Sequence, residues 1–256
     1  MRKSRVLERL RRNEAVLCAK SNITNPWITE IIGMSGYDCI WLCMEHCTGD
    51  YVSIENCIRA GKLYDMDTMV RVDKSGYPNI IKPLELDASG IMYPHCKNER
   101  EAEELVSIAK FYPVGKRPLD GGNIDANFCN MPLKEYMTYS NENKFVMVQI
   151  EDKEAIGQID GIVKTDGIDI VFIGPGDLSQ SFGTPGETNN PKIREVIEKV
   201  AESCKKNNKP WGLPVSKDCI KKYYDMGARF FTVGADVVGV YRYFKDNLEE
   251  ILKQLS

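Results

Sequence analysis

The chain has 256 residues, 43% of them hydrophobic, with 34 lysines and arginines against 37 aspartates and glutamates. A net charge of −3 excludes the strong basic footprint of a nucleic-acid or anionic-membrane binder, so we expect a small-molecule partner, no nucleic acid and no membrane. The sequence has neither an apolar run of about eighteen residues nor a secretory signal. Nine cysteines without a Cys-x-x-Cys motif fit a reducing compartment, and together these features predict a cytoplasmic protein.

The predicted elements alternate along the chain. A short N-terminal helix comes first, because Val6, Leu7 and Leu10 share one helical face. Eight short runs rich in β-branched and aromatic residues follow, separated by longer segments with helical periodicity. These runs begin near Ala15, Cys39, Asp67, Gly90, Phe145, Asp169, Pro210 and Arg229. Residues that favour helix N-termini precede several of the helical segments, at Asn25, Ser53, Asn98, Asn190 and Ser216.

Eight alternating units in this length predict a single α/β domain over residues 1–256, folded as a (β/α)8 TIM barrel with parallel strands. A doubly wound open sheet is the alternative. The spacing is irregular only between the fourth and fifth strands, where residues 118–143 form an insert with a predicted extra helix that starts at Pro132.

Polar residues gather where predicted strands end, which in a barrel is the mouth that carries the chemistry. Four strands contribute them: Glu45, His46, Arg71, Gln149, Glu151 and Asp177. Gln149 and Glu151 are two residues apart, so both can face inward. Glu151 and Asp177 end consecutive strands, and two carboxylates with open positions suit a hard divalent cation such as Mg²⁺ or Mn²⁺. Two unrelated surface acids are the alternative.

The Gly-Pro-Gly-Asp segment after the sixth strand has two interpretations. Gly174 and Gly176 leave room for a ligand to approach the backbone, and the amides of Gly176 and Asp177 can bind a carboxylate. A tight turn without a ligand would use the same residues.

Residues 41–47 place Cys43, His46 and Cys47 close together and so raise the possibility of a zinc site. On a strand, however, Cys43 and Cys47 share one face while His46 lies on the other, which disfavours a shared ion. His46 can instead act as a general base at the mouth, or serve as a hydrogen-bonded structural histidine. His95 follows the fourth strand, and we expect it to have fewer partners than His46.

With these residues placed, the chain resembles the class II, pyruvate-dependent aldolases of the HpcH/HpaI family over nearly its whole length. Four motifs carry the resemblance: Glu45-His46, Val70–Val72, Val148–Glu151 followed by Glu154-Ala155, and Phe172–Ser179. The resemblance implies a barrel of the phosphoenolpyruvate/pyruvate type. It also implies a lyase that reversibly cleaves a 4-hydroxy-2-oxo acid, such as a 2-keto-3-deoxy sugar acid or 4-hydroxy-2-oxo-heptanedioate, to pyruvate and an aldehyde.

The resemblance also assigns roles to residues. Glu151 and Asp177 would bind a divalent metal (Mg²⁺, Mn²⁺ or Co²⁺) that chelates the α-keto acid, His46 would be the acid/base, and Arg71 the cation beside the keto oxygen. Substrate contacts would come from Gln149, Gly176, Asp177 and Leu213, while Glu45 and Glu85 would support the site. Cys43 is a departure, because the family often has an aspartate there that pairs with the histidine. The motif Gly115–Pro118 also departs from the usual Gly-x-Arg-Gly.

The C-terminal segment has a long apolar stripe at helical spacing: Val237, Val240, Tyr241, Phe244, Leu248, Ile251, Leu252 and Leu255. It reads either as an eighth barrel helix that packs on its own subunit or as a contact between subunits. The resemblance favours a helix swapped between subunits of a homo-oligomer, a hexamer, in which Glu85 reaches a neighbour's mouth. An acyl-CoA lyase of the same superfamily and a barrel that binds an α-keto acid without turnover are the alternative functions.

Overall fold

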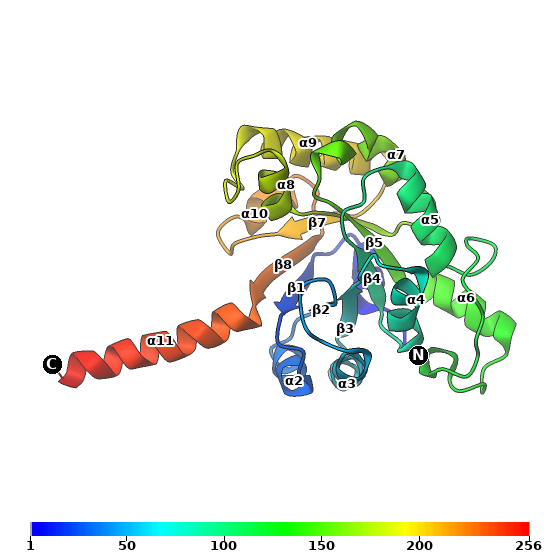
Figure 1. Cartoon of the computed structure of the whole chain (residues 1–256), viewed down its shortest axis with the longest axis horizontal. Coiled ribbons are helices and arrows are strands. Elements are labelled where there is room, and N and C mark those ends of the chain that lie inside the picture. The colour runs from blue at the N-terminus through cyan, green and yellow to red at the C-terminus, as the bar shows by residue number, and fades with distance from the viewer. Residues whose placement is uncertain (1, 256) are drawn as a thin grey trace.

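A computed structural model describes residues 2–255, so Met1 and Ser256 of the predicted domain lie outside the described residues. Eight parallel strands form a closed barrel, in which each strand pairs with the next and β8 pairs with β1 (Figure 1). The predicted TIM barrel is therefore confirmed, and the doubly wound open sheet is wrong.

The strands begin within one residue of their predicted starts. They are β1 (Val16–Ser21), β2 (Cys39–Cys43), β3 (Asp67–Arg71), β4 (Gly90–Tyr93), β5 (Phe145–Ile150), β6 (Ile170–Ile173), β7 (Trp211–Pro214) and β8 (Phe230–Ala235). The helices are α1 (Arg5–Arg11), α2 (Pro26–Met34), α3 (Tyr51–Lys62), α4 (Tyr77–Glu85), α5 (Glu99–Ala109), α6 (Leu133–Asn143), α7 (Ile159–Lys164), α8 (Pro175–Ser181), α9 (Pro191–Lys206), α10 (Ile220–Asp225) and α11 (Asp236–Leu255). Two 3-10 turns, η1 (Ile124–Ala126) and η2 (Lys153–Gln158), complete the elements.

Alternation along the strands builds two apolar layers. Inward-facing side chains fill the barrel, among them Trp41, Met69, Met147, Phe172 and Phe230. The N-terminal helix α1 packs Val6, Leu7 and Leu10 into this same cluster, as its amphipathic pattern predicts. The outward faces of the strands pack against the surrounding helices. Side chains thus fill the barrel interior from the end covered by α1 to the level of the mouth.

Three of the five predicted helix caps are confirmed. The side chains of Asn25, Asn98 and Asn190 accept hydrogen bonds from backbone amides at the starts of α2, α5 and α9. The expectation for Ser53 is wrong because Asp50 lies three residues earlier and caps α3 instead. Ser216 is not a cap either, since α10 begins only after Cys219.

The insert after α5 ends in the predicted extra helix, α6, which starts directly after Pro132. The guanidinium of Arg117 lies 2.9 Å from Asp125, and the Tyr136 hydroxyl donates to the same carboxylate at 2.6 Å. Because α6 leads directly into β5, it lies at the amino-terminal end of the strands, opposite the mouth (Figure 1). In its own chain the insert therefore does not reach the site.

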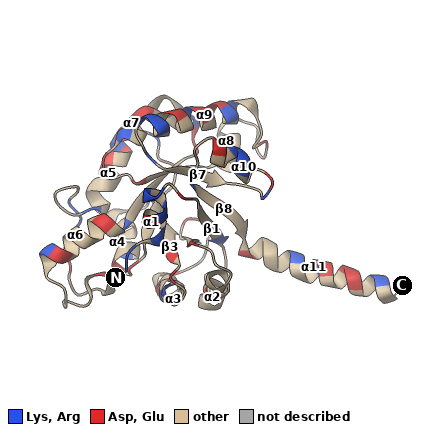
Figure 2. Ribbon diagram, turned by 180° about the vertical axis from the view of Figure 1, so that it is seen from behind, with Lys and Arg blue, Asp and Glu red and all other residues tan. Residues whose placement is uncertain are grey.

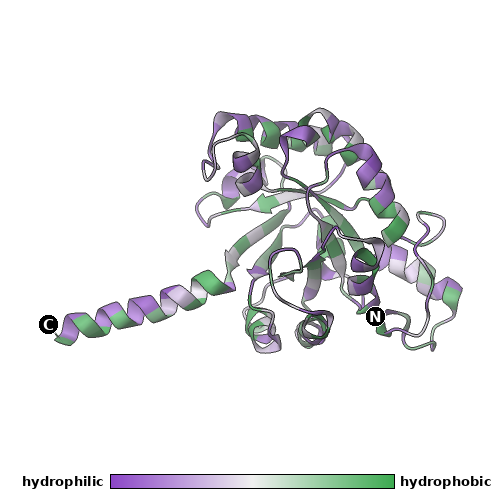
Figure 3. Cartoon of the chain, in the orientation of Figure 1, coloured by the Kyte–Doolittle hydropathy of each residue, from purple (hydrophilic) through white to green (hydrophobic). Residues whose placement is uncertain are grey.

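Helix α11 extends away from the barrel (Figure 1), and none of its residues is buried. Its apolar residues recur along the whole exposed length (Figure 3). The interpretation of α11 as a helix that packs on its own barrel is therefore wrong for this chain. At its first turn, the Asp236 carboxylate accepts hydrogen bonds from the Asn22 and Ile23 amides and from the Ser21 hydroxyl, which anchors the start of α11 to the end of β1.

Charged residues of both signs are interspersed along outer helices such as α7 and α9 (Figure 2), consistent with the small net charge. None of the helices within residues 2–255 has the length and apolar content needed to cross a membrane. Six of the nine cysteines are buried, as expected for residues that fill the core.

Candidate active site

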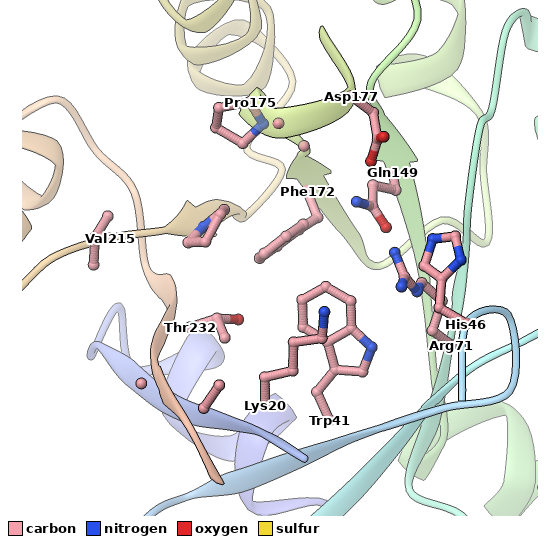
Figure 4. A pocket seen from close by; sticks show the side chains of 15 residues that line it. Lys20, Trp41, His46, Arg71, Gln149, Phe172, Pro175, Asp177, Val215 and Thr232 are labelled. Carbon is pink, nitrogen blue, oxygen red and sulfur yellow. The ribbon is translucent and has the colours of Figure 1, made fainter. Parts of the chain in front are cut away.

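A cavity of about 440 Å³ opens at the carboxyl ends of the strands (Figure 4). Its lining residues come from most of the strands and from α8: Lys20, Trp41, His46, Arg71, Gln149, Phe172, Gly174, Pro175, Gly176, Asp177, Pro214, Val215, Thr232, Gly234 and Ala235. The predicted residues His46, Arg71, Gln149, Gly176 and Asp177 all line it. The convergence of polar strand ends expected from the sequence therefore occurs.

Glu151 lies directly behind this surface and is fully buried. Its carboxylate accepts hydrogen bonds from the Gln149 side-chain amide and, at 2.8 Å, from the backbone amide of His95. Gln149 and Glu151 face inward together, while Val148 and Ile150 pack in the outer layer, as alternation predicts. A Cβ atom on Gly174 would lie 2.5 Å from a Glu151 carboxylate oxygen, so only glycine leaves that carboxylate open to the cavity.

The electrostatics around Glu151 favour a cation. Burial raises the pKa of Glu151 to about 8, and the charge of the nearby Asp177 adds to this rise, although the His95 amide and Arg71 oppose it. Asp177 lies in the first turn of α8 and is half-buried. The side-chain oxygen of the buried Gln149 has no hydrogen-bond partner within residues 2–255. These oxygen groups fit a hard divalent cation.

Two of the nearby carboxylates, those of Glu151 and Asp177, are the predicted ligands for such an ion. No three His, Cys, Asp or Glu side chains converge on a possible metal position in the part of the chain that the structure describes. The assignment of Glu151 and Asp177 as the metal ligands stays a prediction. The same finding gives no support to a zinc site at Cys43, His46 and Cys47.

Arg71 is held rigidly at the end of β3. Its guanidinium lies 3.0 Å from a Glu45 carboxylate oxygen and donates hydrogen bonds to the Cys43 sulfur at 3.2 and 3.4 Å. It also lies 4.8 Å from the centre of the Trp41 ring, within the range of a cation–π contact. Cys43 and Glu45 thus both contact Arg71.

The two histidines have different numbers of partners from those expected. His46 lines the cavity, but its side chain is 57% exposed and its Nε2 atom lies 3.6 Å from Glu45. His95 has more partners, not fewer: its ring lies 3.0 Å from Asp152 and 3.5 Å from Glu45, and its amide donates to Glu151. His95 has a positive φ of 49°, and this backbone conformation accompanies its contact with Glu151.

Two predicted residues lie away from the cavity of this chain. The Leu213 side chain is buried in the layer between strands and helices, because it faces outward from β7. Glu85 ends α4, just before β4, and so lies at the opposite end of the barrel from the mouth. Burial raises the pKa of Glu85, with Arg117 and Asp125 as charged neighbours.

Among the cavity residues that the sequence interpretation missed are Lys20, Trp41 and Thr232. Lys20 ends an apolar run on β1 in the same manner as the polar residues that were recognised on other strands. Alternation from Val16 and Cys18 would have placed Lys20 inward.

The chain is similar in sequence to several known proteins. The model of the HpcH/HpaI aldolase/citrate lyase family matches residues 21–241. A protein of Enterobacter sp. (strain 638) named 5-keto-4-deoxy-D-glucarate aldolase is 32% identical over 237 residues, which cover 91% of each chain. A protein of the same name from Klebsiella pneumoniae is 31% identical over 235 residues, covering 91% of this chain and 90% of the relative.

Solved structures show the same similarity. An HpcH/HpaI aldolase from Desulfitobacterium hafniense DCB-2 superimposes with a TM-score of 0.90 at 26% identity, covering 96% of this chain and 95% of the other. The citrate synthase SbnG has a TM-score of 0.87 at 29% identity, covering 96% and 97%. The resemblance read from the motifs and the predicted lyase class are thereby confirmed.

Proposed function

Because the chain belongs to the HpcH/HpaI aldolase/citrate lyase family, we propose that it is a divalent-metal-dependent aldolase. It cleaves a 4-hydroxy-2-oxo acid reversibly to pyruvate and an aldehyde. The observation that carries this proposal is the placement of Glu151, Asp177 and Arg71 at one cavity at the mouth of the barrel.

In this proposal Glu151 and Asp177 hold Mg²⁺, Mn²⁺ or Co²⁺. When bound, such an ion acts as a Lewis acid toward a ketone oxygen. Gly174 keeps the face of Glu151 free, and the hydrogen bonds from Gln149 and His95 fix the carboxylate. The protein thus orients the metal-binding group before any substrate enters.

Arg71 stabilises the negative charge that develops on the keto oxygen as the carbon–carbon bond breaks. Its contacts with Glu45, Cys43 and Trp41 fix the guanidinium, so little reorganisation is needed during the reaction. Gln149 lines the cavity, and its side-chain oxygen has no hydrogen-bond partner among the described residues. This oxygen can therefore accept a hydrogen bond from a substrate hydroxyl. The Gly176 and Asp177 amides are proposed contacts for the α-carboxylate.

Cleavage requires removal of the proton from the 4-hydroxyl group, scission of the bond between carbons 3 and 4, and protonation of carbon 3 to give pyruvate. We assign His46 to the proton transfer, since it is the histidine that lines the cavity. The Glu45 carboxylate lies 3.6 Å from the His46 ring and can orient this ring when substrate is bound.

The names of the curated relatives support a keto-deoxy sugar acid as the substrate. One observation favours the acyl-CoA alternative: the similarity to the citrate synthase SbnG, an enzyme whose name denotes condensation rather than cleavage of a sugar acid. Citrate formation from oxaloacetate and acetyl-CoA is therefore measured beside the aldol reaction. The acyl-CoA alternative would be favoured if free thiol is released from acetyl-CoA in the presence of oxaloacetate and no hydroxy-oxo acid yields pyruvate.

The decisive experiment is a retro-aldol screen over 4-hydroxy-2-oxo acids with coupled detection of pyruvate, with Mn²⁺ and with a chelator. We expect pyruvate release that needs metal and is lost in Glu151→Ala and in Asp177→Ala. Glu154→Ala is a matched control, because Glu154 is an exposed acid three residues beyond Glu151. Full activity of both site variants under chelation would refute the proposed mechanism. Tight binding of pyruvate without any turnover would instead identify a binding protein.

We also propose that the chain is a homo-oligomer, a hexamer built from dimers that exchange α11. The exposed apolar face of α11 has a counterpart on α2, where Trp27, Ile31 and Met34 are exposed. A helix of 20 residues is about 30 Å long, enough to cross the flank of a second barrel. In such an assembly Glu85 and the insert face a neighbouring subunit. A cytoplasmic location stays a prediction.

A further inference from the structure

The cavity has two chemically different sides. Arg71, His46, Gln149 and Asp177 come from β3, β5 and the segments after β2 and β6, and carry the chemistry proposed above. Lys20 lies over Trp41, with Thr232 on one side of it and Arg71 and His46 on the other (Figure 4). No role in the metal or keto-acid chemistry has been assigned to Lys20, Trp41 or Thr232.

Lys20 carries a charge without a carboxylate partner among the residues that the structure describes. Its ammonium nitrogen lies 5.0 Å from the centre of the Trp41 ring, and its other described electrostatic neighbour is the Cys47 thiol. No ion pair to Lys20 occurs within residues 2–255. Arg71, the other cation of the cavity, is paired with Glu45. An unpaired, half-buried lysine facing a cavity is a site for an anionic group of a ligand.

Thr232 and Trp41 supply further unused polar atoms. Thr232 is 5% exposed, yet its hydroxyl has no hydrogen-bond partner among the described residues, and the same holds for the indole nitrogen of Trp41, which is 4% exposed. Buried polar atoms without partners are costly, and at a binding site a ligand can satisfy them. Lys20 and Thr232 both belong to the lining, so the charge and the hydroxyl act on the same space.

The backbone gives this side of the cavity its shape. β8 has a register shift against β1 between Cys18 and Lys20, and the bulged segment contains Gly234. Gly234 has a positive φ of 82°, a conformation that disfavours other residues. Gly234 and Ala235 both line the cavity, so the bulge replaces side chains with backbone next to Lys20.

We propose that Lys20, assisted by the Thr232 hydroxyl, binds a carboxylate at the far end of the substrate, on the half that leaves as the aldehyde. The inference rests on the proposed function and narrows the substrate to hydroxy-oxo acids that carry a second carboxylate. Arg71 and the Glu151–Asp177 pair take the keto-acid end, and Lys20 takes the other end. A neutral aldehyde half leaves the Lys20 charge unpaired.

The test compares two substrates of equal chain length. 4-Hydroxy-2-oxohexanedioate ends in a carboxylate and yields pyruvate and 3-oxopropanoate, whereas 4-hydroxy-2-oxohexanoate ends in a methyl group and yields pyruvate and propanal. We expect kcat/KM of the wild-type protein to be higher for the diacid by about tenfold or more, the effect of one charge-assisted contact. In Lys20→Gln this preference should disappear, mainly through a higher KM for the diacid, and Lys20→Arg should restore part of it.

Lys217→Gln is the matched control, because Lys217 is exposed on the loop after β7 and does not line the cavity. It should keep the wild-type preference. Equal losses on both substrates in Lys20→Gln, or an unchanged preference, would overturn the Lys20 inference while leaving the aldolase proposal intact. Pyruvate covalently trapped on Lys20 by borohydride would also overturn it. Failure of the wild-type protein to release pyruvate from either acid would overturn both proposals.

Discussion

Substitution of Gly174 by alanine tests the geometry of the metal-binding carboxylate. The added Cβ atom would lie 2.5 Å from a Glu151 oxygen and 2.8 Å from the Gln149 side-chain nitrogen. Neither side chain can swing aside, since both are buried and bonded to each other. Overpacking of this kind costs about 1–3 kcal/mol. For a chain of this size that corresponds to a fall in Tm of roughly 3 to 10 °C.

The same displacement should weaken the proposed metal site. Loss of a well-oriented carboxylate lowers metal affinity by about 10- to 100-fold, judged from substitutions of residues that orient ligands. Calorimetric titration with Mn²⁺ and thermal unfolding in chelator measure the two effects. Gly157→Ala is the control, because a Cβ atom there meets no atom within 4 Å. Unchanged Tm and unchanged Mn²⁺ affinity in Gly174→Ala would refute the assigned role of Glu151.

Three further predictions follow from named contacts. Arg71→Lys should lower kcat by about tenfold or more, because a lysine cannot contact Glu45 and Cys43 together, and steady-state kinetics that match wild type would contradict this. Burial alone would raise the pKa of Asp87, but Lys144 and Lys62 outweigh it and lower the pKa to about 2. The folded pKa is depressed, so the stabilisation of about 2 kcal/mol is present above pH 4 and lost as the pH falls toward 2. Urea unfolding of Asp87→Asn should thus show that deficit at pH 7 but a smaller one at pH 3. Phe244→Glu should dissociate the oligomer, as measured by light scattering, while leaving the Asp236 anchor of α11 in place.

The starts of the strands could be predicted to within one residue. A short apolar run rich in β-branched residues between two helical segments is too short for a helix and therefore indicates a strand. Alternation also placed Gln149 and Glu151 on one inward face, and the barrel rule placed them at the mouth. The same two rules applied to β1 would have included Lys20, which follows the inward-facing Val16 and Cys18 and lies one residue before the end of the strand. The sequence therefore contains a signal that places Lys20 at the mouth.

Other features depend on tertiary contacts that no local pattern encodes. The role of His95 comes from its backbone amide, which reaches Glu151 across 56 positions of sequence. Leu213 belongs to an alternating strand, and a shift of one residue decides whether it faces the cavity or the helices. Periodicity shows that α11 has an apolar face but not which molecule covers it. For that reason the helix that projects from the barrel could not be predicted from its own sequence.

The charges of the cavity connect the two proposals. Glu45, Glu151 and Asp177 are three acids close to the mouth, and Arg71 and Lys20 are the two permanent cations there. Without a metal these acids outnumber these cations, and burial raises the pKa of Glu151, with the charges of Asp177 and Glu45 adding to the rise. A bound divalent ion would reverse this balance and leave the cavity positive. A dianionic substrate then matches the site better than a monoanion, with one carboxylate near the acid pair and its ion and the other at Lys20. The preference for a second carboxylate should therefore be strongest in the metal-loaded protein.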